Sequence, residues 1–233
     1  MCKKATVLKE INKKPEGSII SASKLYKEKF ANVMSEVAFA KTMSRLCESG
    51  EVVRVSRGVY CKAINTKYGM ILPGERDITN VYTENNKGME VGYALYNKIG
   101  VTTQVSKKKE IFSSSVDCQS KQIGNVNIRK VNLKYTNETI AVIQLMELLY
   151  HIENIQDLNE NMTASCFYML SKNYNDRVFD SVQKEIKYPR WVIASLREVL
   201  GRFGVENSLN RYLSTYSKYR IPNMRSIYEI ARV

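Results

Sequence analysis

The sequence predicts an α+β protein, and three observations lead to this prediction. Residues 35–62 combine an amphipathic helix, a glycine stop and a short two-stranded ribbon. Residues 109–133 contain strand-like segments in which apolar and polar side chains are interleaved. Most of the chain from residue 139 onward has apolar positions at helical spacing. We therefore expect a helical domain with a β-ribbon (1–66), a linker (67–86), and a mixed α/β domain with a helical C-terminal portion (87–233).

Three short elements come before the central helix of the first domain. Residues 5–14 form an amphipathic segment that ends ahead of Pro15, which predicts a first helix. Residues 18–20 predict a brief extended piece. Ser21 is a suitable N-cap for a second helix over residues 22–30, since its hydroxyl can accept a hydrogen bond from a free backbone N–H.

The segment Ser35–Lys62 predicts a third helix followed by a hairpin. Ser35 is the expected N-cap, and Phe39, Met43 and Leu46 form one apolar stripe at i, i+4 and i+7. Gly50 suits the left-handed position that ends a helix. Strands at 52–55 and 59–61 flank the turn 56–58. Three helices followed by a hairpin is the order of a winged helix-turn-helix, in which the third helix reads DNA.

The face of the third helix opposite its apolar stripe combines small, hydroxyl and basic side chains. Such a face can approach a major groove closely, donate to base edges and contact phosphates. The hairpin tip adds two arginines, and the second helix adds lysines for the backbone. The predicted DNA contacts are Lys24, Lys27, Ser35, Ala38, Lys41, Thr42, Ser44, Arg45, Arg54, Ser56 and Arg57. The alternative is a helix–hairpin core unit whose basic face is merely solvated.

The second domain is predicted from its periodicity and turn residues. Residues 89–99 suggest a helix ending at Gly100, and residues 139–150 the most apolar helix of the chain. Strands are expected at 109–112 and within 122–133, with a hairpin turn at Gly124-Asn125. Further helices are expected at 164–170, 176–186, 190–203, 208–219 and 225–231.

Charge and composition point to an anionic partner. The chain has a formal net charge of +13, and residues 1–67 contribute 14 Lys and Arg against 6 Asp and Glu. This excess suits an anionic partner, meaning nucleic acid or a membrane surface. The five cysteines are odd in number and form no CxxC pair, so we expect free thiols in a reducing cytosol. No apolar segment approaches the length of a membrane span, so we expect a soluble, cytoplasmic protein without a membrane partner.

Few residues suggest catalysis. His151 is the only histidine, and neither GxGxxG nor GxxxxGK[ST] occurs, so we expect no catalytic residue, metal or cofactor. We interpret His151 as a cation at a helix C-terminus, and Glu147 as a residue of that helix's polar edge. Asp176 and Asp180 lie four residues apart, as metal-binding acids of a nuclease could, although a solvated charged helix explains them more simply. The basic and aromatic residues of 187–232 suit a helical bundle better than a grip on single strands.

Two sequence blocks resemble a known family. Met43-Ser44-Arg45-Leu46, Gly50, Val52, Arg54-Val55 and Arg57-Gly58-Val59-Tyr60 are similar to a motif of AbiEi-type proteins, with Met43 in place of leucine. Gly100-Val101-Thr102-Thr103-Gln104-Val105 resembles a second motif of the same family, with small departures. The resemblance is good over residues 1–65, fair over 88–150 and faint beyond.

AbiEi-type proteins are transcriptional regulators and the antitoxins of type IV toxin–antitoxin systems. The resemblance implies a protein that is not an enzyme and that represses its own operon by binding promoter repeats, for which two copies on inverted repeats is one arrangement. It also implies antagonism of a nucleotidyltransferase-like toxin without a stable complex, by the second domain.

Two other functions remain open on the sequence. The first is a nucleic-acid-processing enzyme whose nuclease-like second domain is delivered by the winged helix. The second is a winged helix used only to dock a protein.

Overall fold

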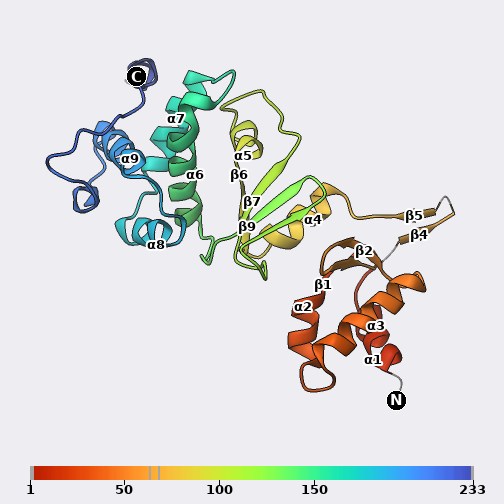
Figure 1. Ribbon diagram of the computed structural model, residues 1–233. Coiled ribbons are helices and arrows are strands. Elements are labelled where there is room, and N and C mark those ends of the chain that lie inside the picture. Colours follow the sequence, from red (N-terminus) through yellow and green to blue (C-terminus); the bar gives the residue numbers. More distant parts are fainter. Residues whose placement is uncertain (1–2, 63, 68, 232–233) are drawn as a thin grey trace. The chain divides into compact units, whose positions relative to one another are not determined.

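The computed structural model describes residues 3–62, 64–67 and 69–231 (Figure 1). The described chain is a mixture of helices and small sheets, so the α+β class is confirmed. It divides into two compact units. The first contains residues up to Val81 together with Asp117–Asn127, and the second contains Tyr82–Val116 and the chain from Ile128 onward.

The first unit begins with four helical elements and a three-stranded sheet. In chain order these are α1 (Lys3–Asn12), β1 (Ile19–Ser21), α2 (Ala22–Leu25), the π-helical η1 (Tyr26–Phe30), α3 (Glu36–Glu48), β2 (Val53–Ser56) and β3 (Val59–Cys61). The sheet is antiparallel with order β1-β3-β2. Tyr60 of the central strand therefore lies opposite Ile20 on one side and Arg54 on the other.

Both expected N-caps of this unit are present. The Ser21 hydroxyl accepts from the Lys24 N–H, and the Ser35 hydroxyl accepts from the Ala38 N–H at 3.4 Å. Gly50 ends α3 with a φ of +74°, a left-handed conformation that a side chain would strain. The predicted helices and hairpin of residues 5–61 are thus confirmed to within two residues, apart from the π-helical turn of η1.

The core of the first unit is built on the predicted apolar stripe. Phe39, Met43 and Leu46 of α3 are buried with Val7 and Ile11 of α1. The Phe39 ring stacks on Phe30 with centroids 5.4 Å apart, which ties α3 to η1. Burial of these rings, rather than intrinsic helix propensity, stabilises such short elements.

Residues 67–86, expected to be a linker, contain regular structure. The hairpin of β4 (Ile64–Thr66) and β5 (Gly69–Ile71) leads to α4 (Glu75–Thr83), on which Ile78 and Tyr82 are buried. The sequence does carry a signal for α4: two acids in the first turn and apolar residues four positions apart.

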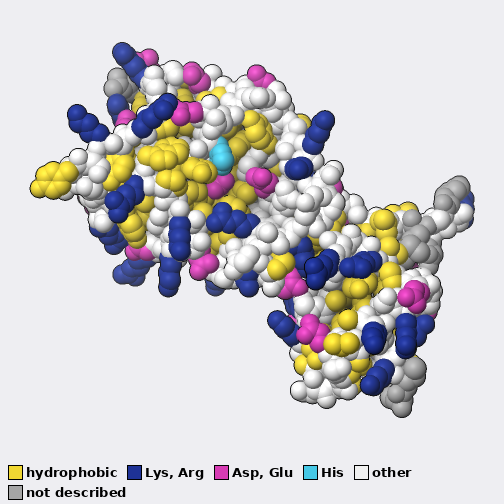
Figure 2. Space-filling model, viewed as in Figure 1, with side chains coloured by type: hydrophobic (Ala, Val, Ile, Leu, Met, Phe, Trp, Pro, Cys, Tyr) yellow, Lys and Arg dark blue, Asp and Glu magenta, His cyan; other side chains and the backbone are white. Residues whose placement is uncertain are grey.

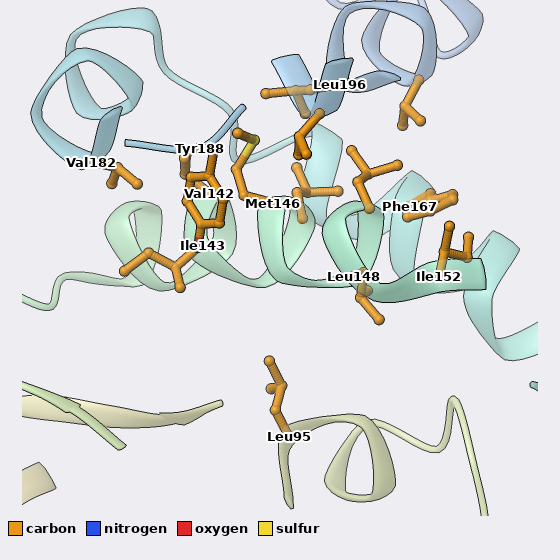
Figure 3. Close-up of a cluster of buried hydrophobic side chains, with 14 of the residues drawn as sticks. Leu95, Val142, Ile143, Met146, Leu148, Ile152, Phe167, Val182, Tyr188 and Leu196 are labelled. Atoms are coloured by element: carbon orange, nitrogen blue, oxygen red, sulfur yellow. The ribbon is translucent and has the colours of Figure 1, made fainter. Parts of the chain in front are cut away.

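The second unit is organised around α6 (Asn137–His151). It also contains β6 (Gly88–Val91), α5 (Tyr93–Lys98), β7 (Lys109–Ser113), most of β9 (Val126–Lys130), η2 (Ile152–Asn154), α7 (Glu160–Ser171), α8 (Asp176–Ile186), α9 (Arg190–Arg202), η3 (Leu209–Tyr212) and α10 (Arg225–Ile230). The largest sheet has the order β6-β7-β9-β8, with β8 at Ser120–Ile123. Figure 3 shows the apolar side chains of α6 directed toward Leu95 of α5 on one side and toward α7, α8 and α9 on the other.

One predicted helix is wrong in its first part, and another is wrong over most of its length. Residues 89–99 divide into β6, which pairs with β7, and α5, because Gly92 breaks the chain at φ +65° and ψ −150°. Residues 208–219 form only the one turn of η3. Two backbone N–H groups of this segment donate to side chains and not to the carbonyls of a preceding helical turn. The Ser208 N–H donates to the Asp176 carboxylate, and the Ser214 N–H donates to the Tyr219 hydroxyl. Tertiary partners override periodicity at both places.

Candidate nucleic-acid interface

The exposed face of α3 is the strongest candidate for a functional surface in the first unit. With Phe39, Met43 and Leu46 buried, the 3.6-residue repeat directs Val37, Lys41 and Ser44 to the opposite side, and Arg45 flanks them. All four are exposed. This face therefore offers one apolar side chain, one hydroxyl and two cations within little more than two turns of helix.

One acid lies on the same face. Glu48 is exposed near the C-terminal end of α3, where the Ser44 hydroxyl donates to its carboxylate at 3.4 Å. Lys41 and Arg45 have no ion-pair partner in the part of the chain that the structure describes. Figure 2 shows dark blue Lys and Arg side chains gathered over the first unit, with magenta acidic side chains among them.

Thr42 does not lie where the sequence analysis placed it. It is 6% exposed, and its hydroxyl donates to the Ala38 carbonyl of the previous turn at 2.8 Å. The physical reason is its spacing: Thr42 lies three residues after Phe39 and four before Leu46, so it belongs to the buried stripe. Ala38 is half-buried for the same reason.

The hairpin tip presents two cations. Arg54 and Arg57 are exposed on β2 and on the turn before β3. Ser56, by contrast, is engaged within the unit, because its hydroxyl donates to the Gln122 carbonyl at 3.0 Å. A hydroxyl held by a carbonyl has no donor left for a phosphate, so Ser56 is removed from the predicted DNA contacts.

The remaining predicted contacts differ in availability. Lys27 is exposed. Lys24 is exposed as well but forms an ion pair with Glu28 at 3.8 Å. Because both side chains are solvated, this ion pair is weak. Ser35 is exposed and already caps α3 through its oxygen. Its hydroxyl proton stays available as a donor.

Sequence reasoning missed Val37. Its side chain is 67% exposed at the middle of the outer face, and Val33, in the connection before α3, is 59% exposed. The signal was available: Val37 lies four residues before Lys41 and therefore shares its face. An exposed apolar side chain between polar neighbours is ordinary on a protein surface, but on a groove-entering helix it can contact a thymine methyl group.

The segment 117–121, at the start of β8, makes polar contacts with α2 within the first unit. The Ser23 hydroxyl donates to Asp117, and Lys121 pairs with the same carboxylate at 2.8 Å. Partial burial alone would raise the pKa of Asp117, but the hydrogen bonds from Lys121 and Ser23 lower it to about 2. Asp117 is therefore charged at neutral pH and neutralises Lys121, which cannot add to the basic surface.

The acids considered for a nuclease serve structural contacts. Asp176 accepts from the Tyr174 hydroxyl and the Ser208 N–H, while Asp180 accepts from Arg211 and the Tyr212 hydroxyl. The bonds from Ser208, Arg211 and Tyr212 attach α8 to η3. Among the described residues, no three His, Cys, Asp or Glu side chains cluster closely enough to hold a metal ion. The contacts of Asp176 and Asp180 therefore give no support to the nuclease interpretation.

Glu147 and His151 differ from their predicted roles. Glu147 is 5% exposed, so it does not belong to the polar edge of α6, and its carboxyl accepts from the Tyr188 hydroxyl at 2.5 Å. Burial raises the pKa of Glu147 to about 7 and lowers the pKa of His151. His151 Nε2 lies 3.9 Å from the Glu147 carboxyl, but burial disfavours the charge on each residue, so the contact is not a strong ion pair.

The other sequence expectations concern cysteines and membranes. Cys47, Cys61, Cys118 and Cys166 are free thiols, while Cys2 lies outside the described residues. Among the helices that the structure describes, none is both long and apolar enough to cross a bilayer.

Comparison with known protein families gives a match. The model of a family described as "Family of unknown function (DUF6088)" matches residues 6–162, which begin in α1 and end in α7. No curated protein matches the chain. The family description names no activity and says nothing of AbiEi-type proteins.

Proposed function

Because the chain belongs to the DUF6088 family, whose description names no activity, we propose a function from the geometry of the first unit. The protein is a DNA-binding regulator whose first unit is a winged helix-turn-helix. It binds double-stranded DNA of its own promoter and represses its own operon. The exposed face of α3, with Lys41, Ser44 and Arg45 opposite a buried stripe, is the observation that carries this proposal.

The topology of the first unit supports the winged-helix assignment. Its elements follow the order helix, strand, two helices and hairpin, and the sheet order is β1-β3-β2. In a winged helix-turn-helix, the third helix enters the major groove, the preceding helix crosses the backbone and the hairpin forms the wing. These positions correspond to α3, to α2 with η1, and to β2–β3.

The side chains divide into those that read bases and those that bind the backbone. Arg45 and Lys41 present donors suited to the O6 and N7 acceptors of guanine, and Ser44 can bond to several base edges. Lys24 and Lys27 contact phosphates, as does Ser35 through its hydroxyl proton. Arg54 and Arg57 of the wing contact the adjacent backbone or minor groove.

The biological role follows from the resemblance to AbiEi-type proteins. In this role the protein is an antitoxin that binds repeats in its promoter and antagonises a nucleotidyltransferase-like toxin encoded beside it. Antagonism proceeds without a stable complex between the two proteins. Two copies bound to inverted repeats is the arrangement that a palindromic operator would require. The protein acts in the cytoplasm, and the proposal gives it no catalytic activity.

The decisive experiment is a binding titration on the DNA upstream of the protein's own gene. Arg45→Ala should weaken binding by about 1–3 kcal/mol, or roughly 5- to 150-fold, if Arg45 makes a bidentate contact to guanine. Arg57→Ala should weaken binding less and flatten its salt dependence, because a lost phosphate contact releases fewer counterions. Fluorescence anisotropy at several salt concentrations measures both effects.

Arg177→Ala is the matched control, since it removes an exposed arginine from α8 in the second unit. It should bind DNA as the wild type does. If Arg45→Ala and Arg57→Ala both keep wild-type affinity, the proposed interface is wrong. Binding of an isolated partner protein with little dependence on salt, and no binding of DNA, would instead favour a docking role.

A further inference from the structure

The second unit contains a cavity that the proposed DNA-binding function does not use. Its volume is about 460 Å³, within the usual range for small-molecule sites, and all of its lining residues belong to the second unit. The lining residues that matter here are Tyr93, Tyr96, Lys107, Lys108, Glu110 and His151. Figure 2 shows the only histidine, in cyan, at the surface with hydrophobic and acidic side chains beside it.

Aromatic rings form one wall of the cavity, and they are held in place. The Tyr93 hydroxyl donates to the Asn154 carbonyl at 3.0 Å and accepts from the Gln156 N–H at 3.2 Å. The Tyr93 and Tyr96 rings meet edge to face with centroids 5.8 Å apart, and the Tyr96 and His151 rings are 6.3 Å apart. Since Tyr93 and His151 are only half-buried, their rings are available for a planar ligand.

Unpaired charges surround this wall. The side chains of Lys107, Lys108 and Glu110 are exposed, and none has an ion-pair partner within the described ranges. The turn that carries the two lysines is fixed, because Ser106 Oγ accepts from the Lys108 N–H at 3.1 Å and donates to the Lys108 carbonyl.

The Glu110 carboxylate is also positioned by the fold. Glu110 lies opposite Val91 in the β6–β7 ladder. A Cβ atom on Gly92 would lie only 2.7 Å from Glu110 Oε2, so the carboxylate rests directly over the glycine. The cavity thus combines a carboxylate acceptor beside Gly92, two cations at its mouth and half-buried rings.

We propose that this cavity binds a nucleotide. The base stacks on Tyr93 and His151, the phosphate contacts Lys107 and Lys108, and Glu110 accepts hydrogen bonds from the base edge. A carboxylate favours a base with adjacent donors. Guanine offers an N1–H and an amino group side by side, whereas uracil offers a single N–H between two carbonyls that repel a carboxylate. The nucleotide is either free or the 5′-terminal nucleotide of a single strand.

Calorimetric titration of the full chain with GMP, guanosine, UMP and a short 5′-phosphorylated single strand tests this proposal. Wild type should bind GMP more tightly than guanosine and more tightly than UMP. Lys107→Ala/Lys108→Ala should weaken GMP binding by about 10-fold while leaving guanosine unchanged. Glu110→Gln should reduce the preference for GMP over UMP by about 10-fold, since it removes the double acceptor.

Lys184→Ala, at an exposed lysine of α8, controls for nonspecific attraction of phosphate to a basic protein. It should bind GMP as the wild type does. Tighter binding of the single strand than of GMP identifies a strand end as the ligand, and equal or weaker binding identifies the free nucleotide. The proposal is overturned if folded wild-type protein binds neither GMP nor the single strand. It is also overturned if Lys107→Ala/Lys108→Ala binds GMP as tightly as Lys184→Ala does. Loss of promoter binding would not affect this result.

Discussion

At the scale of single residues, Val37 is where the structure adds most to the sequence analysis. It lies at the centre of the outer face of α3, one turn before Lys41, and is 67% exposed. On a helix in a major groove, this position brings an isopropyl group against base edges. The only apolar group that a base pair presents there is the C5-methyl of thymine.

We therefore predict that Val37 reads thymine in the operator. Replacing single thymidines by deoxyuridines removes only the methyl group. At the one or two positions that Val37 contacts, the replacement should weaken wild-type binding by about 4-fold. This factor corresponds to the roughly 0.8 kcal/mol that burial of one methyl group contributes. Val37→Ala should lose this sensitivity at the same positions, whereas Val105→Ala, an exposed valine of the second unit, should keep it. Equal sensitivity in wild type and Val37→Ala would refute the contact.

Glu147 makes folding stability depend on pH. Burial raises its pKa from 4.5 to about 7, so between these pH values the folded state holds a proton that the unfolded state has released. Stability from this group is therefore fully present below pH 4.5 and is lost as pH rises toward 7. The loss is at most on the order of 3 kcal/mol. The lowered pKa of His151 acts in the opposite direction, because its proton is bound more tightly in the unfolded state.

Glu147→Gln isolates this effect. Urea unfolding from pH 4.5 to 7 should show a decline in the free energy of unfolding for wild type that is smaller in Glu147→Gln. Glu153→Gln, at an exposed position of η2, should follow wild type. Parallel pH profiles for wild type and Glu147→Gln would show that the buried carboxyl does not retain its proton.

At the scale of elements, the junction between β6 and α5 depends on one glycine. Gly92 has a φ of +65° and a ψ of −150°, a region that only glycine occupies readily. It also lies under the Glu110 carboxylate. The dihedral angles of Gly92, together with the pairing of β6 with β7, explain why a segment with helical periodicity divides into a strand and a short helix.

Gly92→Ala should lower the free energy of unfolding by about 1–3 kcal/mol from backbone strain alone. Adding Glu110→Ala should relieve the contact with the new methyl group but not the strain, so the double variant recovers only part of the loss. Gly201→Ala is the control: this glycine lies in α9, and a methyl group added there would have nothing within 4 Å, so alanine should stabilise the helix by about 0.5–1 kcal/mol. Thermal and urea unfolding measure all three. A neutral Gly92→Ala would contradict the strain.

At the scale of the whole molecule, the proposed function separates into two activities. The proposal assigns DNA binding to the first unit and the antitoxin activity to the second. Because the first unit also includes Asp117–Asn127, cutting the chain near residue 81 would divide it. Point variants of the full chain are the appropriate probes.

We predict that Arg45→Ala/Arg57→Ala loses repression of its promoter but still restores growth when co-expressed with the adjacent nucleotidyltransferase-like toxin. The physical reason is that both arginines are exposed and support no core contact. A promoter–reporter assay and a growth assay measure the two activities. Loss of growth rescue with a normally folded variant would mean that antitoxicity requires DNA binding.

Local pattern by itself determined most of the helices, both N-caps of the first unit, the hairpin turn at Gly124-Asn125 and the basic face of α3. These features depend on neighbours within a few residues, which the sequence displays directly. The positions of Thr42 and Val37 could also have been predicted, since helical spacing alone places Thr42 on the buried face of α3 and Val37 on the exposed face.

Only the tertiary structure decided the rest. Residues 89–91 are a strand because β7 lies beside them, and residues 208–219 are mostly irregular because Asp176 and Tyr219 bind their backbone. Glu147 is buried because helices pack on both sides of α6. The cavity is lined by residues from two segments, 92–110 and 151–155, and no local sequence pattern indicates that these segments lie together. Each outcome depends on contacts between segments far apart in the chain, and those form only when the core is assembled.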